Sequence, residues 1–264
     1  MLTRDNFINS PISIENELLA FFKKNDNLII FDIGACEAED SIRYSLLFPK
    51  SVVYAFEPRP DNIEKGENLI KKYKKTNITL EKIALSNKNG TAEFFLSEGE
   101  PKDLKNDENW NYGNKSSSLL APSEQLKEHT EWLNFNNRIQ VDTLRLEDYV
   151  QRKAIKQIDF IHMDVQGAEL MVLDGAGSFL NRIKLIWLEV EAVELYMGQP
   201  LKNDVEEYMQ NNNFINVLDT VGSTSGDQLY VNRLFFSDEL IQKVKRLRKD
   251  GGILSRLKSL FKSI

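Results

Sequence analysis

The chain has 264 residues, of which 41% are hydrophobic and 28% are charged, so it has the composition of a globular protein. The net charge of −6 argues against a general nucleic-acid-binding role, and the single cysteine, Cys36, excludes an internal disulfide and a multi-cysteine metal site. The sequence contains no run of about 18 apolar residues and no apolar core of a secretory signal near its start, so we expect a cytoplasmic protein.

The first 85 residues alternate between helix-like and strand-like segments. The strand-like segment 28–33 is a continuous apolar run, which is typical of a strand buried on both faces. The alternation therefore predicts a mainly parallel sheet with helices on both faces. Helices are predicted at 14–22 after an N-cap at Ser13, at 40–48 and at 61–75, and strands at 28–33, 52–56 and 78–85.

The alternation breaks after the third strand, where we expect an insertion at about 86–143. The turn signal at 87–90 and the short β-like run at 91–96 predict a hairpin with the strand at 78–85. The residues that follow, 97–137, are polar and loop-like. A long loop in a compact domain is typical of a segment that covers a binding site or is disordered.

The alternation resumes after the insertion and continues almost to the end of a domain placed at 1–240. The fold class is therefore α/β, with a doubly wound and mainly parallel sheet. Strands are predicted at 138–143, 158–165, 184–190, 214–218 and 233–236, and helices at 146–152, 168–179 and 203–211.

The last segment, 241–264, reads as a basic amphipathic helix. Eight lysines and arginines fall between 243 and 264 against one acid, Asp250, and apolar residues recur on one helical face. Such a helix suits peripheral contact of 243–264 with an anionic membrane, which for this protein would be the inner membrane surface. Packing on the domain or on a second subunit is the alternative.

The most specific signature is the pair formed by Asp32-Ile33-Gly34-Ala35 and Glu57-Pro58. Glu57 follows Gly34 by 57−34 = 23 residues, about one helix and one strand later. In a doubly wound sheet this spacing places a tight glycine turn beside a carboxylate that accepts both ribose hydroxyls. Ile83 and Ala84, which end the predicted third strand, add an apolar slot for an adenine ring. The sequence therefore predicts a site for a cofactor that contains a nucleoside.

The acids that follow the turn indicate which cofactor this is. A site for NAD normally has several glycines whose N–H groups contact a diphosphate. Here one glycine is followed by Cys36-Glu37-Ala38-Glu39-Asp40, whose acids would repel a diphosphate. They would tolerate the amine and the sulfonium of S-adenosylmethionine, so this cofactor is favoured over NAD.

Several short motifs occur along the chain in a set order. They are Phe31-Asp32-Ile33-Gly34-Ala35, Phe56-Glu57-Pro58, Ile83-Ala84-Leu85-Ser86, Gly90-Thr91-Ala92-Glu93, Val141-Asp142-Thr143-Leu144, Met163-Asp164-Val165-Gln166-Gly167-Ala168-Glu169 and Leu173-x-Gly175-Ala176. Together they resemble the FkbM family of S-adenosylmethionine-dependent methyltransferases, over about residues 28–190.

The resemblance implies a class I methyltransferase fold, which is Rossmann-like and has a seven-stranded sheet with an antiparallel last strand. It also implies methyl transfer, usually to a hydroxyl oxygen, in polysaccharide, glycolipid or secondary-metabolite biosynthesis. The chain departs from the family pattern in two places. Cys36 and Ala38 stand where the family has asparagine and a second glycine, and Gln166 stands where it has glutamate.

Methyl transfer from a sulfonium is an in-line displacement, so a group that removes the proton of the nucleophile should lie close to the methyl carbon. His162 and Asp164 are two residues apart at the end of one predicted strand, so they share a face. Glu189 ends the next strand. We predict that Asp164 contacts the cofactor or the substrate hydroxyl, and that Glu189 or His162 acts as the base.

Other readings of these residues stay open. Asp164, Glu169, Glu189 and Glu191 could together hold a divalent cation, although a metal is not favoured. The serine run 116–118, with Trp110, Tyr112 and Trp132, suits a pocket for a glycan or another small-molecule acceptor. An NAD-dependent oxidoreductase and a non-catalytic methyltransferase-like binding module are the alternative functions.

Overall fold

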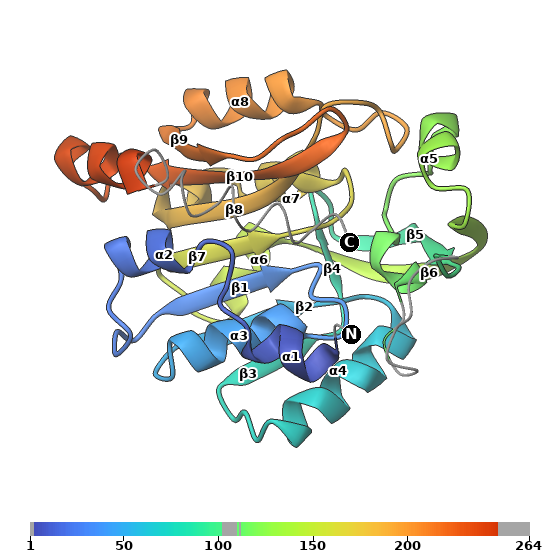
Figure 1. Ribbon diagram of the computed structural model, residues 1–264, viewed down its shortest axis with the longest axis horizontal. Helices are drawn as coiled ribbons and strands as arrows, with labels where there is room; N and C mark the ends of the chain where they lie inside the picture. The colour runs from blue at the N-terminus through green and yellow to red at the C-terminus, as the bar shows by residue number, and fades with distance from the viewer. Residues whose placement is uncertain (1–2, 102–109, 111, 248–264) are drawn as a thin grey trace.

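The computed structural model describes residues 3–101, 110 and 112–247. A seven-stranded sheet forms its centre, in the order β3-β2-β1-β7-β8-β10-β9, and Figure 1 shows these strands in sequence from bottom to top. Strand β10 runs antiparallel to both of its neighbours, as expected for the last strand. The strands are β1 (Ile29–Ile33), β2 (Val52–Phe56), β3 (Ile78–Glu81), β7 (Ile158–Met163), β8 (Ile183–Glu191), β9 (Phe214–Asp219) and β10 (Ser225–Asn232).

Helices cover both faces of the sheet because its central strands are apolar on both faces. In β1, Phe31 and Ile33 point to one core cluster and Ile30 to the other. Helices α6, α7 and α8 pack on the first face, and α2, α3 and a helix over 238–247 pack on the second. The helices are α1 (Arg4–Asn9), α2 (Glu15–Phe21), α3 (Glu39–Leu47), α4 (Pro60–Lys72), α5 (Glu124–His129), α6 (Leu146–Arg152), α7 (Glu169–Ala176) and α8 (Lys202–Asn211).

The strand predicted at 78–85 is divided in two. Its first part is β3, at the edge of the large sheet, whereas β4 (Ala84–Ser86) belongs to a second, three-stranded sheet. A continuous apolar pattern does not reveal that a strand changes sheets between Glu81 and Ala84. Ile83 and Ala84 therefore do not end the third strand of the large sheet, although they still lie at its edge.

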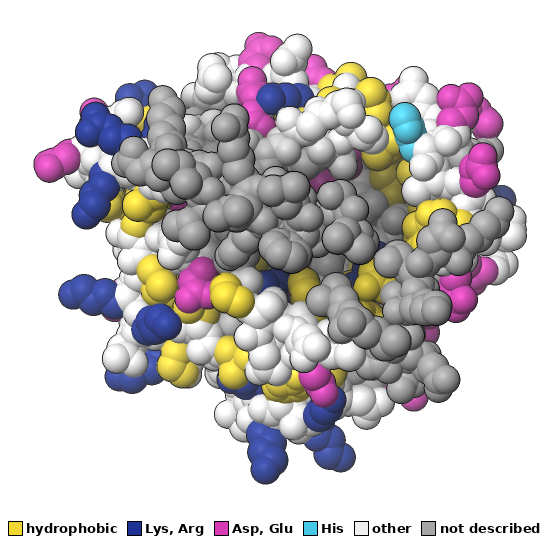
Figure 2. All heavy atoms as spheres, in the orientation of Figure 1, with side chains coloured by type: hydrophobic (Ala, Val, Ile, Leu, Met, Phe, Trp, Pro, Cys, Tyr) yellow, Lys and Arg dark blue, Asp and Glu magenta, His cyan; other side chains and the backbone are white. Residues whose placement is uncertain are grey.

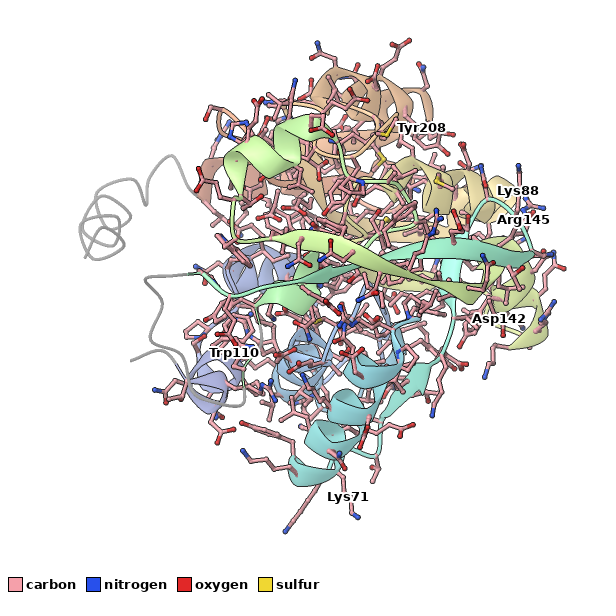
Figure 3. The ribbon with its side chains drawn as sticks, turned by 90° about the vertical axis from the view of Figure 1, so that its right-hand side faces the viewer. Lys71, Lys88, Trp110, Asp142, Arg145 and Tyr208 are labelled. Atoms are coloured by element: carbon pink, nitrogen blue, oxygen red, sulfur yellow. The ribbon has the colours of Figure 1, made fainter. Side chains whose placement is uncertain are left out.

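The predicted hairpin is wrong in its pairing. The small sheet has the order β4-β6-β5, so β6 (Asn134–Arg145) lies between β4 and β5 (Gly90–Glu98) and pairs with both. Figure 3 shows β5 and β6 side by side across one face of the molecule, with Asp142 and Arg145 toward one end. The turn at 87–90 thus connects two strands that are not hydrogen-bonded to each other.

The insertion also contains more regular structure than its polar sequence indicates. Among its described residues, Gly113–Ser116 forms a 3-10 helix (η1), α5 follows, and β6 begins at Asn134, four residues before the predicted strand. Leu126 and Leu133 anchor this region in a small apolar cluster with Tyr196.

The last predicted strand, 233–236, is a turn, and the strand is β10 instead. The polar start of β10, Ser225-Gly226-Asp227-Gln228, resembles a loop in sequence. Pairing on both sides, with β8 and β9, stabilises it as a strand.

The helix over 238–247 crosses the boundary predicted at 240/241, so its first turns belong to the domain. Ile241 and Val244 are buried in the core, while Lys243 and Arg246 are exposed. The helix lies at the left of Figure 1, and Figure 2 shows Lys and Arg side chains on that side of the molecule. The rest of the predicted tail, 248–264, lies outside the described residues. None of the helices within the described ranges is both long and apolar enough to cross a membrane.

The turn after β1 depends on Gly34, which has a φ of +85°. A Cβ atom at this position would lie 1.8 Å from the carbonyl oxygen of Asp164, at the end of β7. The amides of Gly34 and Ala35 donate to the carbonyl oxygen of Phe56 at 3.0 Å and 2.9 Å. The ends of β1, β2 and β7 therefore meet in backbone contact at this glycine.

Replacing Gly34 with alanine should lower the free energy of unfolding by about 3 kcal/mol, because a left-handed alanine costs about 1 kcal/mol and the clash with a fixed backbone adds to it. Gly198→Ala is the matched control, since Gly198 has a φ of +72° and open space around its Cβ position. It should lose only about 1 kcal/mol. Urea unfolding of both variants measures the difference, and equal losses would contradict a steric role for Gly34.

Candidate functional site

A cavity opens at the carboxyl ends of β1, β2 and β7, where a doubly wound sheet binds its ligands. Six of the predicted cofactor residues line it: Gly34, Glu57, Pro58, Ile83, Ala84 and Asp164. The opposite wall comes from the insertion, through residues that were not predicted as cofactor contacts: Phe94, Asn114, Lys115, Ser117 and Leu119. The insertion thus forms part of the site.

Glu57 is the acid at the centre of the cavity wall. The amide of Cys36 donates to its Oε2 at 2.9 Å, and the amide of Arg59 donates to its Oε1 at 2.8 Å. Burial raises the pKa of Glu57 to about 8, although these two amides favour the charged form. Each carboxylate oxygen keeps further acceptor capacity, which suits the two hydroxyls of a ribose.

Apolar side chains form the adjacent part of the cavity. Ile83, Ala84 and Leu85 lie on one side, and Phe94 and Leu119 come from the insertion. These residues provide an apolar slot beside Glu57, as an adenine ring next to its ribose requires.

The turn between Gly34 and α3 is strained where the sequence departs from the family pattern. Cys36 has a φ of 49° and Ala38 a φ of 64°, a region that favours glycine or asparagine. The backbone nevertheless keeps the turn that brings the Cys36 amide to Glu57. The departures therefore change the conformational energy of the turn and leave its contact with Glu57 in place.

Asp32 and Ala35 are not among the residues that line the cavity. Asp32 is buried, and its two carboxylate oxygens contact His162 Nδ1 at 2.9 Å and Ser41 Oγ at 2.5 Å. Asp32 therefore supports the site from beneath and orients His162, whereas Ala35 contributes the backbone contact to Phe56.

His162 is held as a cation. Burial disfavours its charged form, but the hydrogen bond and charge of Asp32 outweigh this effect and raise the pKa of His162 to about 9. Its ring also packs edge-on against Tyr44, with 5.6 Å between ring centroids. Because a protonated imidazole cannot accept a proton, this environment disfavours His162 as the base at neutral pH.

Asp164 and Glu189 are brought together by Gln166. The Gln166 Nε2 atom donates to Asp164 Oδ1 at 2.7 Å and to Glu189 Oε2 at 2.5 Å. Gln166 has a φ of 57°, and its left-handed turn lets its side chain reach back between the two acids. Since Asp164 lines the cavity, the pair lies at its rim.

Burial raises the pKa of Glu189 well above its usual range, and the nearby charge of Asp164 raises it further. Glu169 and Glu191 are also buried, and burial likewise raises their pKa values, that of Glu191 to about 7. Glu169 Oε1 accepts the amides of Val165 and Gly167, so Glu169 holds the turn before α7. No group of three or more histidine, cysteine or acidic side chains within the described ranges is arranged to hold a metal ion.

The serine run 116–118 connects the insertion to this acidic pair. Ser118 Oγ donates to the carbonyl oxygen of Gln166 at 2.7 Å, and Ser117 lines the cavity. The Tyr196 hydroxyl lies 2.7 Å from Gln166 Oε1 and 2.8 Å from the carbonyl oxygen of Ser116. The run therefore packs between the cavity and the loop after β8.

The aromatic residues predicted beside this run have separate positions. Trp110 is buried and donates from its Nε1 atom to Glu39 Oε1 at 2.9 Å, and its ring packs at a tilt against Phe7 and Tyr112. Trp132 packs in the apolar cluster around Tyr196. Trp110 thus stabilises the start of α3, whereas Trp132 belongs to the cluster of Tyr196, whose hydroxyl contacts Gln166.

The cavity fits a nucleoside cofactor with an amino-acid end in two respects. Glu57 can accept two hydroxyls, and Asn114 presents a buried Oδ1 atom that has no hydrogen-bond partner in the described part of the chain. Sequence reasoning missed Asn114, Lys115 and the bridging role of Gln166. For Gln166, the sequence signal was its presence where the family has glutamate; for Asn114 and Lys115, the sequence offered no signal.

Two sequence comparisons bear on this site. Residues 32–215 match the family described as the Methyltransferase FkbM domain. The chain is also 32% identical over 194 residues to the 2-O-methyltransferase NoeI of Sinorhizobium fredii (strain NBRC 101917 / NGR234), and this alignment covers 73% of the chain and 75% of that protein.

Solved structures resemble the chain more distantly. An rRNA methylase from Streptococcus thermophilus is 14% identical with a TM-score of 0.46, over 85% of this chain and 98% of the other. TrmK of M. capricolum in complex with S-adenosyl-homocysteine is 12% identical with a TM-score of 0.44, over 96% and 88%. The family assignment rests on the two sequence matches.

The raised pKa of Glu57 predicts how stability depends on pH. Because Glu57 titrates at about 8 when folded and at about 4.3 in an unfolded chain, the folded state binds more protons between these values. The contribution of Glu57 to the unfolding free energy is therefore fully present below about pH 4.3, and it is lost as the pH rises from there to about 8. The unfolding free energy of Glu57→Gln should therefore fall less steeply over this window than that of the wild type. Urea unfolding at several pH values measures it, with exposed Glu207→Gln as the control, and parallel curves would contradict it.

Proposed function

Because the chain belongs to the FkbM family of S-adenosylmethionine-dependent methyltransferases, we propose that it methylates a hydroxyl oxygen of a glycan, a glycolipid or a related small molecule. The strand order and the antiparallel β10 are those of the class I methyltransferase fold. The observation that carries the proposal is the pair of carboxylates, Asp164 and Glu189, joined by Gln166 at the rim of the cofactor cavity. Family membership favours this function over the alternative of an NAD-dependent oxidoreductase.

Different residues of the cavity suit different parts of the cofactor. Glu57 accepts the ribose hydroxyls, and the apolar slot around Ile83 and Ala84 takes the adenine ring. Gly34 and Asp164 place the amino-acid end beside the strand ends. When bound, S-adenosylmethionine supplies an electrophilic methyl carbon whose leaving group is a neutral thioether.

Glu189 is the residue best placed to remove the proton of the acceptor hydroxyl. Glu189 is half-buried, and a carboxylate whose pKa is raised in this way is a stronger base when ionised than a fully exposed one. Gln166 orients Glu189 by a hydrogen bond and holds it next to Asp164, which orients the acceptor at the cavity rim. His162, held as a cation by Asp32, partly balances the negative charge of this region.

The class of acceptor is supported by one relative and by the side chains around the acidic pair. The printed name of NoeI states a 2-O-methyltransferase, and a sugar 2-hydroxyl is an acceptor of the proposed kind. Ser117 lines the cavity together with Asp164, and the half-buried Trp132 packs against the cluster around Tyr196; a hydroxyl and an aromatic face of this kind suit a sugar.

Glu189→Gln tests this assignment. Loss of a general base should lower kcat about 100-fold or more, while the dissociation constant for S-adenosylmethionine stays the same because Glu189 does not line the cofactor cavity. Formation of S-adenosylhomocysteine with a panel of sugars and glycolipids measures kcat, and calorimetry measures cofactor affinity. Glu207→Gln, an exposed change on α8, is the control. Full activity of Glu189→Gln, or a wild type that methylates amines and no hydroxyls, would contradict the proposal.

The same geometry bears on metal dependence. The Gln166 amide group lies between Asp164 and Glu189, where a bridging cation would have to lie. We therefore expect the reaction to proceed without a divalent cation.

The expected result is that wild-type protein dialysed against EDTA keeps its rate. In Gln166→Glu, three carboxylates would meet without a compensating donor, so the rate should fall and Mg²⁺ or Mn²⁺ should restore part of it. A wild type that loses its activity in EDTA would sink this prediction.

Cytoplasmic location, and contact of 243–264 with the inner membrane surface, stay predictions. The basic composition of 243–264 supports them, and a lipid-linked acceptor would make such contact useful. In the described part of this segment, Val244 packs on the domain and leaves Lys243 and Arg246 exposed.

A further inference from the structure

Within the described part of the insertion, Lys115 is the basic side chain that lines the cofactor cavity. It lies in η1, near Cys36 and the start of α3. We propose that Lys115 binds the α-carboxylate of S-adenosylmethionine, so that the insertion recognises the amino-acid end of the cofactor. This inference rests on the cofactor assignment in the proposed function.

A carboxylate at this end of the cavity needs a cation. The N-terminus of a helix normally attracts an anion, but α3 begins with Glu37, Glu39 and Asp40 beside its first turn. Glu37 and Glu39 are both buried. Unless a cation lies between them and the ligand, these acids would repel the cofactor carboxylate.

The other cations near these acids are already engaged. Arg4 pairs with Glu37, and Lys65 Nζ lies 3.0 Å from Glu37 Oε1. Neither Arg4 nor Lys65 lines the cavity. Among the described basic residues around the start of α3, Lys115 is therefore the one that lines the cavity.

Lys115 makes only long contacts with the described protein. Its Nζ atom lies 3.7 Å from Glu39 Oε1, which exceeds hydrogen-bond distance, and 5.4 Å from the centre of the Trp110 ring. Burial opposes its charge, but Cys36, Glu39 and Glu37 together raise the pKa of Lys115. Trp110, labelled in Figure 3, is itself held at the start of α3 by its hydrogen bond to Glu39. The ammonium is therefore charged, and its donors remain available.

Asn114 gives a second, independent sign of a ligand on this wall. Its side chain is 1% exposed, and its Nδ2 atom donates to Glu37 Oε1 at 2.8 Å and to Asn62 Oδ1 at 2.6 Å. Its Oδ1 atom has no hydrogen-bond partner within the described ranges. A buried acceptor without a partner is unfavourable unless a ligand supplies a donor. The cofactor carries such donors in its ammonium and ribose hydroxyls, so Asn114 and Lys115 present an acceptor and a cation to one zwitterionic ligand.

The test compares S-adenosylmethionine with its decarboxylated analogue, which keeps the sulfonium and the amine but lacks the carboxylate. Wild-type protein should bind S-adenosylmethionine about 10- to 100-fold more tightly than the analogue, as expected for a charged hydrogen bond. In Lys115→Met, which keeps the apolar stem of the side chain, this preference should disappear. Isothermal titration calorimetry measures both dissociation constants for each protein.

Lys65→Met is the matched control, because it removes a lysine near the same acids but outside the cavity, and it should keep the wild-type preference. If Lys115→Met weakens both ligands equally, Lys115 has a structural role and the inference is overturned. If the wild type binds both ligands equally well, the inference fails while the proposed function stands. If it binds neither ligand, the proposed function fails as well.

Discussion

The close approach of Gly34 to the end of β7 is the constraint on which the site depends. With hydrogen as its side chain, this residue lets the turn after β1 lie directly against the carbonyl of Asp164. The same turn hydrogen-bonds to Phe56 and brings the Cys36 amide to Glu57. One backbone contact thus places Glu57, the turn and Asp164 around a common cavity.

A second constraint is negative charge. The carboxyl ends of the strands and the start of α3 gather more acids than bases, and burial raises the pKa of several of them. Unpaired buried charge is unfavourable, so each acid needs a donor or a cation nearby. His162 pairs with Asp32, and the Gln166 amide group donates hydrogen bonds to Asp164 and Glu189. The Lys115 ammonium lies 3.7 Å from Glu39. This balance suits a cofactor with a sulfonium and an ammonium better than a diphosphate.

The insertion contacts both the cavity and the residues that hold the acidic pair. Its η1 segment lines the cofactor cavity, and two residues later Ser118 donates to the backbone of Gln166, which bridges the acidic pair. The loop after β8 joins the same network through the Tyr196 hydroxyl. The insertion is therefore built into the site, and changes in it should affect cofactor and acceptor together.

Local sequence determined most of the elements of the large sheet and half of the cavity. The apolar runs that end at Gly34, Glu57 and Asp164 are read correctly, because the carboxyl ends of all parallel strands in a sheet lie at the same edge. Tertiary structure decided the rest: that β4 leaves the large sheet, that β6 separates β4 from β5, and that Asn114 and Lys115 face Glu37 and Glu39. These pairings join residues far apart in the chain, and their energy comes from burial and charge in the folded state. No periodicity in the sequence records such contacts, because periodicity reports only which face of its own element a residue occupies.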